Sequence, residues 1–143
     1  MADYGITEMT ALLGEVFAPW IQVLDIRPIA LDSTGASFVL PESRDLVRGG
    51  GDGPAVVCGQ AVAAVADTAS VLALAGLNKR FRNCTTVDLT THFMRPLMLG
   101  DVDVRIEALS NGRRMAVTRA EFRAKGSDKL AATATCSFAY LED

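Results

Sequence analysis

The chain has 143 residues, half of them apolar, and a formal net charge of −3. This length suits one domain, residues 1–143, that buries a core without disulfide or metal staples. The mildly acidic balance disfavours a nucleic-acid partner. Three cysteines without a Cys-x-x-Cys pair disfavour a disulfide framework or a zinc site, and no motif implies a metal or redox cofactor. The first residues, MADYGITEMT, lack a secretion signal, so we expect a cytoplasmic protein.

The N-terminal part of the chain predicts one helix and two strands. Apolar residues at helical spacing indicate a short amphipathic helix over Thr7–Phe17, which Pro19 should end, so residues 1–20 form an N-terminal helical segment. Val23–Leu31 and Ala36–Leu40 then predict a β-hairpin, because turn-forming residues separate the two extended runs.

A long apolar segment from Gly59 to Leu77 has the composition of a buried helix, and Asp67 is its only charged residue. Burying an unpaired charge costs several kcal/mol, so Asp67 should be paired, capped or used in chemistry. The segment is marginally long enough for a membrane span. A central carboxylate costs about 3 kcal/mol on insertion, so we expect a core helix and no membrane partner.

After this helix the apolar period changes to two, which predicts four strands in a meander. Asn111-Gly112 predicts a tight hairpin turn, because both residues accept positive φ. An alanine-rich helix followed by a long antiparallel sheet favours an α+β fold in which a curved sheet wraps around the helix. The predicted strands are Asn83–Met94, Asp101–Ser110, Arg113–Lys125 and Lys129–Leu141.

Three segments carry a resemblance to a known family, and the third, the strands of the closing hairpin, is generic. The first is VCGQAVAAVADTA at 57–69, which is similar to a His-Gly-Gly stretch leading into a helix with an acid eight residues after the first glycine. The second is TVDLTTHFMRP at 86–96, followed by Gly100-Asp101. With their order and spacing, the chain over roughly 23–141 resembles the hotdog-fold acyl-CoA thioesterases of the phenylacetate-degradation branch. The resemblance implies a homodimer or homotetramer (a dimer of dimers) that hydrolyses medium-chain or aryl CoA thioesters.

The resemblance assigns roles to three catalytic positions. Asp67 would act as base or nucleophile, the Gly59 N–H would polarise the thioester carbonyl, and Thr86 would help to position water. The alternative for Asp67 is a structural one, in which its carboxylate accepts hydrogen bonds from a neighbouring strand or caps a partner helix. Strand alternation predicts that Thr86 shares a face with Asp88, Thr90 and His92, and we interpret His92 as a polar interface residue.

The chain departs from the family pattern near the start of the helix. Cys58 stands where the family commonly has His, and Gln60 where it commonly has Gly. Asp52 aligns with an Asn that orients water in many relatives; it lies in a glycine-rich loop, 49–53, which we interpret as a rim over the acyl site. Cys58, Gln60 and Asp52 are candidate substrate-binding residues. A nucleophilic Cys58 thiol and a structural one both remain open. These departures leave a non-catalytic acyl- or aryl-CoA binding module as the alternative function.

Gly59 and Asp67 are separated by about 12 Å of helix rise, although both should approach one reacting carbonyl. If both act, Gly59 of one subunit must meet Asp67 of another, and the catalytic site lies at a subunit interface. Two basic groups could pair with the phosphates of coenzyme A. One group comprises Lys79, Arg80 and Arg82, and the other comprises Arg113 and Arg114; both could equally be solvated surface.

Overall fold

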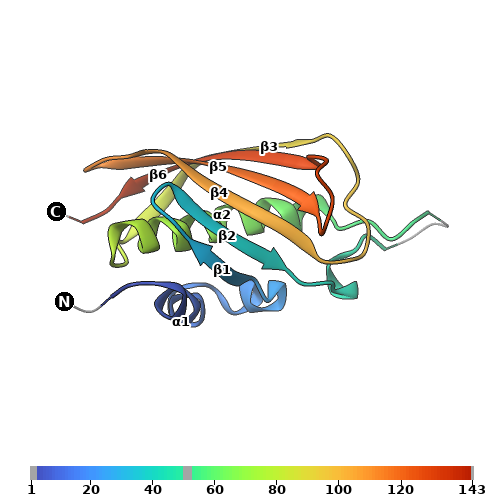
Figure 1. The fold of residues 1–143 in the computed structure, drawn as a ribbon, viewed down its shortest axis with the longest axis horizontal. Helices are drawn as coiled ribbons and strands as arrows, with labels where there is room; N and C mark the ends of the chain where they lie inside the picture. Colours follow the sequence, from blue (N-terminus) through green and yellow to red (C-terminus); the bar gives the residue numbers. More distant parts are fainter. Residues whose placement is uncertain (1–2, 50–52, 143) are drawn as a thin grey trace.

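The computed structural model describes residues 3–49 and 53–142 of the chain. One long helix, α2 (Gly59–Asn78), lies against a curved antiparallel sheet of six strands, as Figure 1 shows. The arrangement is the predicted α+β hotdog fold. The strands are β1 (Arg27–Leu31), β2 (Gly35–Leu40), β3 (Cys84–Phe93), β4 (Val102–Asn111), β5 (Met115–Ala124) and β6 (Ala132–Tyr140). The other helical elements are α1 (Ile6–Val16) and two 3-10 turns, η1 (Pro19–Leu24) and η2 (Arg44–Leu46).

The core lies between α2 and the sheet. The helix buries a wide face made mostly of alanine, valine and leucine, and the small sheet residues expected to receive it are all buried: Ala116, Ala120, Ala132 and Ala134. Small side chains on both surfaces let the backbones approach closely, which favours dense packing. By length and composition α2 is the one described helix that could cross a membrane, but 67% of its most apolar window is buried inside the protein.

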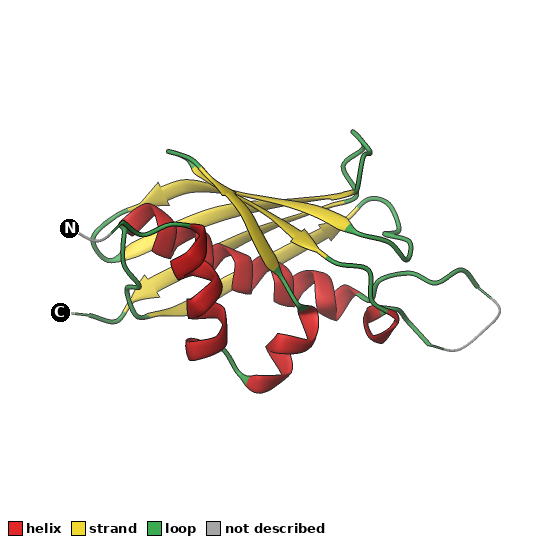
Figure 2. Ribbon diagram, turned by 60° about the horizontal axis from the view of Figure 1, so that its bottom comes forward, coloured by secondary structure: helices red, strands yellow, loops and turns green. Residues whose placement is uncertain are grey.

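The helices gather on one face of the sheet (Figure 2). Gly76 makes the contact between α1, α2 and β1 possible, since a Cβ there would lie 2.8 Å from Leu31 Cδ1 and 3.1 Å from Met9 Sδ. Lys79, in the left-handed conformation with φ 61°, then ends α2.

The predicted strand over Val23–Leu31 is wrong in its first half. Residues 19–24 form η1, and the strand begins only at Arg27. Pro19 occupies the first turn of η1, and Asp25, with φ 53°, ends it. Ile21 and Leu24 are three residues apart, so one face of the 3-10 helix can bury both of them.

The predicted meander also needs a correction. Strands β4, β5 and β6 do follow one another, but β3 pairs with β6, and the sheet order is β1-β2-β4-β5-β6-β3. Consequently β3 is an edge strand of ten residues. The hairpin between β4 and β5 is where it was expected, but neither Asn111 nor Gly112 has positive φ. Asn111 belongs to β4, and the Gly112 N–H donates to the Met115 carbonyl across a longer turn.

Candidate functional site

The structure brings Asp67 and Thr86 together. The Thr86 hydroxyl donates to Asp67 Oδ1 at 2.6 Å, and the carboxylate is half-buried while Thr86 is exposed. Within residues 3–49 and 53–142 no cation forms a salt bridge with Asp67. The second carboxylate oxygen therefore remains able to accept a proton from a bound molecule, and the Thr86 oxygen can still accept a hydrogen bond.

A β-bulge places Thr86 on this side of the sheet. Thr86 pairs with Phe138 and Asp88 with Ser137, so Val87 is an extra residue in β3. One extra residue reverses the alternation beyond it. The prediction that Thr86 shares a face with Asp88, Thr90 and His92 is therefore wrong. Its companions on the helix side are those whose β6 partners are buried: Cys84, Leu89, Thr91 and Phe93.

The N-terminus of α2 supplies backbone donors. Cys58 is the N-cap, and its side chain caps no N–H group. Its carbonyl accepts from the N–H groups of Ala61 and Val62, which leaves those of Gly59 and Gln60 without an acceptor among the described residues. Free N–H groups at the positive end of a helix stabilise negative charge. This end of α2 can therefore hold a carbonyl oxygen that becomes an oxyanion.

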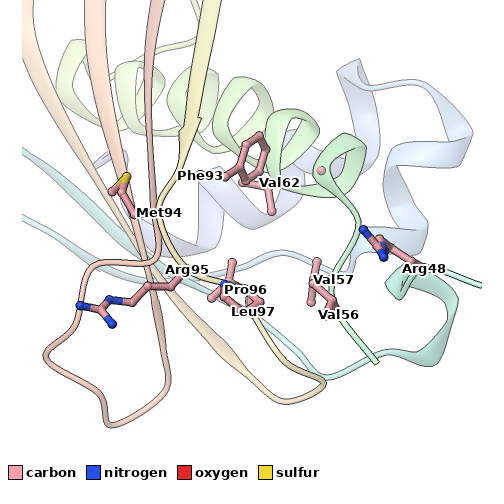
Figure 3. Close-up of a pocket in the computed structure, with 10 residues that line it drawn as sticks. Arg48, Val56, Val57, Val62, Phe93, Met94, Arg95, Pro96 and Leu97 are labelled. Atoms are coloured by element: carbon pink, nitrogen blue, oxygen red, sulfur yellow. The ribbon is translucent and has the colours of Figure 1, made fainter. Parts of the chain in front are cut away.

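A cavity of about 380 Å³ opens beside these donors. In Figure 3 the Phe93 ring lies beside the start of α2, with Val62 next to it and the arginine Arg48 across the opening. A Cβ on Gly59 would lie 3.3 Å from Phe93 Cζ, so the aromatic ring rests almost directly on the glycine backbone. The remaining lining is mainly apolar and includes Val56, Val57, Pro96 and Leu97. The space suits an apolar acyl group next to a polar donor.

The segment before α2 is held in place by backbone hydrogen bonds. The Val57 N–H donates to the Leu97 carbonyl, and the Cys58 N–H donates to the Leu46 carbonyl, both at 2.8 Å. These bonds connect the start of the helix to the chain beyond the Arg-Pro motif and to η2. The orientation of the Gly59 N–H is thus set by two segments that are distant in sequence.

Within one chain the N–H donor of Gly59 and the Asp67–Thr86 pair lie apart. Asp67 and Thr86 are absent from the lining of the cavity beside Gly59, and eight residues of helix separate Gly59 from Asp67 by about 12 Å. One chain therefore presents two candidate half-sites along the same stretch of α2 and β3. One half-site holds a carboxylate and a hydroxyl, and the other holds the N–H donors and the apolar cavity.

The cysteines and the histidine lie around these half-sites. Burial raises the pKa of the Cys84 thiol, and the nearby Asp67 charge raises it further, so this thiol stays protonated at neutral pH. Cys58 is half-buried at the start of α2. His92 points to the outer face of β3 and is exposed, away from Asp67.

Other predicted residues lie elsewhere. Gln60 is exposed in the first turn of α2, and Asp52 lies outside the described residues, as does most of the glycine-rich rim. Lys79, Arg80 and Arg82 lie at the far end of α2, about 30 Å from Gly59 by helix length. Among residues 3–49 and 53–142, no three His, Cys, Asp or Glu side chains are grouped as a metal site would need.

Sequence reasoning missed Phe93 and the Gln60 N–H. The aromatic residue near the end of the second motif could have been noted as a wall of this cavity, but the face of the sheet on which it lies depends on the bulge at Val87. The free Gln60 N–H follows from an N-cap residue without a capping oxygen, a signal that the sequence does carry at Cys58.

Comparison with known proteins adds a family and a fold. The family described as "Thioesterase superfamily" matches residues 56–131, more than half of the chain. A search of curated proteins finds no match. A conserved protein from Pseudomonas aeruginosa is 26% identical, with a TM-score of 0.76 over 90% of this chain and 98% of that one.

Two further solved structures share the fold. A thioesterase from Haemophilus influenzae is 18% identical, with a TM-score of 0.82 over 99% of this chain and 93% of its own. A phenylacetic acid degradation-related protein from Ralstonia eutropha is 22% identical, with a TM-score of 0.75 over 92% of this chain and 98% of its own.

Proposed function

The chain belongs to the thioesterase superfamily, and we propose that it hydrolyses acyl-CoA thioesters with medium-chain or aryl acyl groups, as in the phenylacetate-degradation branch. The observation that carries this proposal is the carboxylate of Asp67 in an otherwise apolar helix: the Thr86 hydroxyl donates to Oδ1 at 2.6 Å, and among the described residues no cation pairs with the carboxylate, so Oδ2 stays free for a bound water. The free donors at Gly59 supply the complementary half of the chemistry. The family match supports thioester hydrolysis in general, and the choice of acyl group rests on the apolar cavity beside Phe93.

The proposed reaction begins with a water molecule at Asp67. The free Asp67 oxygen accepts a proton from the water while Thr86, whose own proton is committed to Asp67, accepts the other water hydrogen. The water oxygen attacks the thioester carbonyl carbon. The developing oxyanion accepts a hydrogen bond from the Gly59 N–H, and the Gln60 N–H lies beside that donor. The C–S bond then breaks, Asp67 returns its proton to the departing thiolate, and the products are a carboxylic acid and free coenzyme A.

Direct attack by the Asp67 carboxylate would instead form a transient anhydride. Single turnover in ¹⁸O-labelled water separates the two mechanisms. If Asp67 acts as a base, it stays unlabelled. If it acts as a nucleophile, it gains the label when the anhydride is hydrolysed at the aspartyl carbon.

We propose a homodimer that joins the two half-sites. Strand β3 is at the edge of the sheet, its exposed side chains include Val87 and Phe93, and the exposed Met94 follows it directly. A long edge strand presents unpaired N–H and C=O groups, which are a template for pairing with another strand. Antiparallel pairing of two β3 strands would leave neither copy with an open edge there.

The positions of the residues along β3 and α2 fit a two-fold axis. An axis through Thr90 relates Thr86 of one subunit to Phe93 of its partner, because the extra residue at Val87 leaves both of them three ladder positions from Thr90. On α2, Gly59 and Asp67 are each four residues from Ala63. One axis that passes near Ala63 and the middle of β3 therefore brings each Asp67 to the partner's Gly59.

The first experiment measures thiol release from acetyl-, medium-chain and aryl-CoA esters by the wild type and Asp67→Asn. We expect hydrolysis by the wild type and a loss of at least about 10²-fold in kcat in the variant, because the base is removed, with the oligomer unchanged in size-exclusion chromatography. A wild type that binds these esters without cleaving them would contradict the proposal and favour the binding module. We also propose a cytoplasmic location, which fits the absence of a disulfide among Cys58, Cys84 and Cys136.

A further inference from the structure

Two basic segments that are far apart in sequence meet in one cleft at the C-terminal end of α2. A cavity of about 640 Å³ is lined by arginines from the chain after α2 and from the β4–β5 turn, together with Tyr140 and Glu142. The arginines are Arg80, Arg82, Arg113 and Arg114. Four guanidinium groups against one carboxylate give this lining a net charge of +3.

Arg82 is built into this cleft. Its guanidinium donates to the Gly112 carbonyl at 3.1 Å and to the Arg113 carbonyl at 2.6 Å, and it lies 3.6 Å above the centre of the Tyr140 ring. Only 13% of the Arg82 side chain is exposed. Its orientation is therefore fixed before any ligand binds, which reduces the entropy lost on binding.

The Tyr140 ring beneath Arg82 is itself held in place. Its hydroxyl accepts from the Asn78 amide at 3.0 Å and donates to Asn111 Oδ1 at 2.6 Å. The Asn111 amide donates to Asn78 Oδ1 at 2.8 Å, which closes a ring of three side chains. The end of α2, the end of β4 and the end of β6 are thus joined under the cleft.

Glu142 is the anion that the cleft holds. Its carboxylate accepts from Arg80 at 3.0 and 3.1 Å and also from Arg82 Nε. Hydrogen bonds from the two arginines lower the pKa of Glu142, so it remains charged at neutral pH. A carboxylate bound between two guanidiniums occupies the position that a phosphate oxygen would take. Among residues 3–49 and 53–142, no carboxylate forms a salt bridge with Arg113 or Arg114.

We propose that this arginine cleft, defined by Arg80, Arg82, Arg113 and Arg114, binds the phosphate groups of a nucleotide, and that Glu142 is the internal competitor that the nucleotide displaces. The proposal rests in part on the proposed function, because a coenzyme A ester carries such phosphates. A free nucleotide acting as an effector has the same chemistry and is the other source.

The distance from the cleft to Asp67 suits the coenzyme A source. Thr86 is four residues from Arg82, so the chain between them spans at most about 14 Å. Along α2, Asp67 is eleven residues from Asn78, or about 16 Å. The phosphates of a coenzyme A ester are separated from its thioester by an extended pantetheine arm, so one molecule can reach from the Asp67 carboxylate to the cleft.

The test uses direct binding, measured by calorimetry, of adenosine 3′,5′-bisphosphate, which has no thioester. We expect Arg80→Gln and Arg113→Gln each to weaken binding by about five- to ten-fold, because each loses one charge-assisted contact. Glu142→Gln should strengthen binding by a similar factor, because the competitor is gone. Arg119→Gln is the matched control, since Arg119 is an exposed arginine that does not line the cleft, and it should bind like the wild type.

Two arms then identify the source of the phosphate. If the ligand is the coenzyme A ester, Arg113→Gln raises KM for that ester but not for the corresponding S-acyl-pantetheine. If it is a free nucleotide, KM for both esters stays unchanged while bisphosphate binding weakens. Equal bisphosphate affinity in the wild type, Arg80→Gln and Arg113→Gln would overturn the proposal, as would a Glu142→Gln variant that binds no more tightly. Because the probe is not hydrolysed, these results do not depend on whether the protein is a thioesterase.

Discussion

Thr86, on an edge strand, donates a hydrogen bond from its hydroxyl to Asp67 Oδ1, in the middle of an apolar helix, at 2.6 Å. This bond leaves Oδ2 as the free oxygen of Asp67. Because the Thr86 proton is engaged, the Thr86 oxygen is left to accept a hydrogen bond from water. Thr86→Val keeps the shape of the side chain but removes the donor. We expect kcat for thioester hydrolysis to fall about 10- to 100-fold, the range for a lost hydrogen bond to a charged group.

Thr86→Ser is the matched control because it keeps the hydroxyl, and its kcat should stay within a few-fold of the wild type. Steady-state thiol release with one acyl-CoA ester measures both variants. Equal activity of Thr86→Val and the wild type would mean that Thr86 only packs beside Asp67.

The Gly59 N–H can be removed without removing the residue from the helix. Proline is tolerated at the first position of a helix, and the extended conformation of Cys58, with ψ 149°, is compatible with a following proline. Gly59→Pro should lower kcat by about 10²-fold or more, the loss typical of one oxyanion donor.

Gly59→Ala places a Cβ against the Phe93 ring, as proline does, but retains the N–H. Its kcat should fall far less than that of Gly59→Pro, and circular dichroism should show both variants folded. Similar losses in both would assign the effect to crowding of Phe93 and not to the lost donor.

The composite site predicts complementation between two inactive chains. Asp67→Asn and Gly59→Pro damage different halves of each site, so a mixed dimer contains one site with both defects and one intact site. Co-expression of the two chains with different affinity tags, followed by purification through both tags, should yield about half of the wild-type kcat per dimer, since one of two sites is intact. Activity no higher than that of either parent would show that Gly59 and Asp67 do not act across the interface.

The local pattern of the sequence was enough to find α2, the catalytic candidate Asp67 and most strand bounds within one or two residues. A single charge in an apolar helix is visible without any tertiary information, and alternation along β4 to β6 reports burial of one face. The strand partners were not visible in this way. Whether β3 pairs with β4 or with β6 depends on how the sheet closes around α2, and no short-range pattern records that choice.

The same reason explains the error at Thr86 and why the arginine cleft was not foreseen. The bulge at Val87 places Thr86 on the same face of the sheet as Leu89, and not on the face of Asp88 that simple alternation predicts. All residues of β3 nevertheless remain in the strand. Arg82 and Glu142 are 60 positions apart, and the contact between them depends on β3 and β6 being neighbours. Sequence reasoning therefore found the two basic groups separately but not the cleft that they form together.

Acid stability should depend on Asp32. Arg105 donates to Asp32 Oδ1 at 3.0 Å and to Oδ2 at 2.8 Å, and these bonds hold the pKa of Asp32 well below its usual range. A carboxyl whose pKa is lower in the folded state stabilises the protein above its unfolded pKa, about 3.9, and this contribution is lost as the pH falls through the folded value.

Asp32→Asn should therefore have a lower Tm than the wild type at pH 5 to 7, and the difference should shrink as the pH is lowered below about 4. Arg105→Gln should lose the same pH-dependent part, because it removes the partner. Thermal unfolding followed by circular dichroism between pH 7 and 2.5 measures both. A Tm difference that stays constant down to pH 2.5 would show that the ion pair does not control the acid response.

Gly35 allows β2 to pair closely with β4, and its replacement should destabilise the fold. A Cβ at Gly35 would lie 1.9 Å from the Ile106 carbonyl oxygen and 2.9 Å from the Ile106 carbonyl carbon, both backbone atoms of the neighbouring strand. Because backbone in a paired strand cannot move aside like a flexible side chain, we expect Gly35→Ala to lower the free energy of unfolding by about 3 kcal/mol.

Gly14→Ala gives the matched comparison, since nothing lies within 4 Å of a Cβ at Gly14, which is inside α1. There the change should raise the free energy of unfolding by about 0.5–1 kcal/mol, because alanine loses less conformational entropy in a helix than glycine. Urea unfolding of both variants measures the two effects, which have opposite signs. If Gly35→Ala were as stable as Gly14→Ala, β2 and β4 would not approach as closely as the structure shows, and the register from Gly35 to Leu40 would need revision.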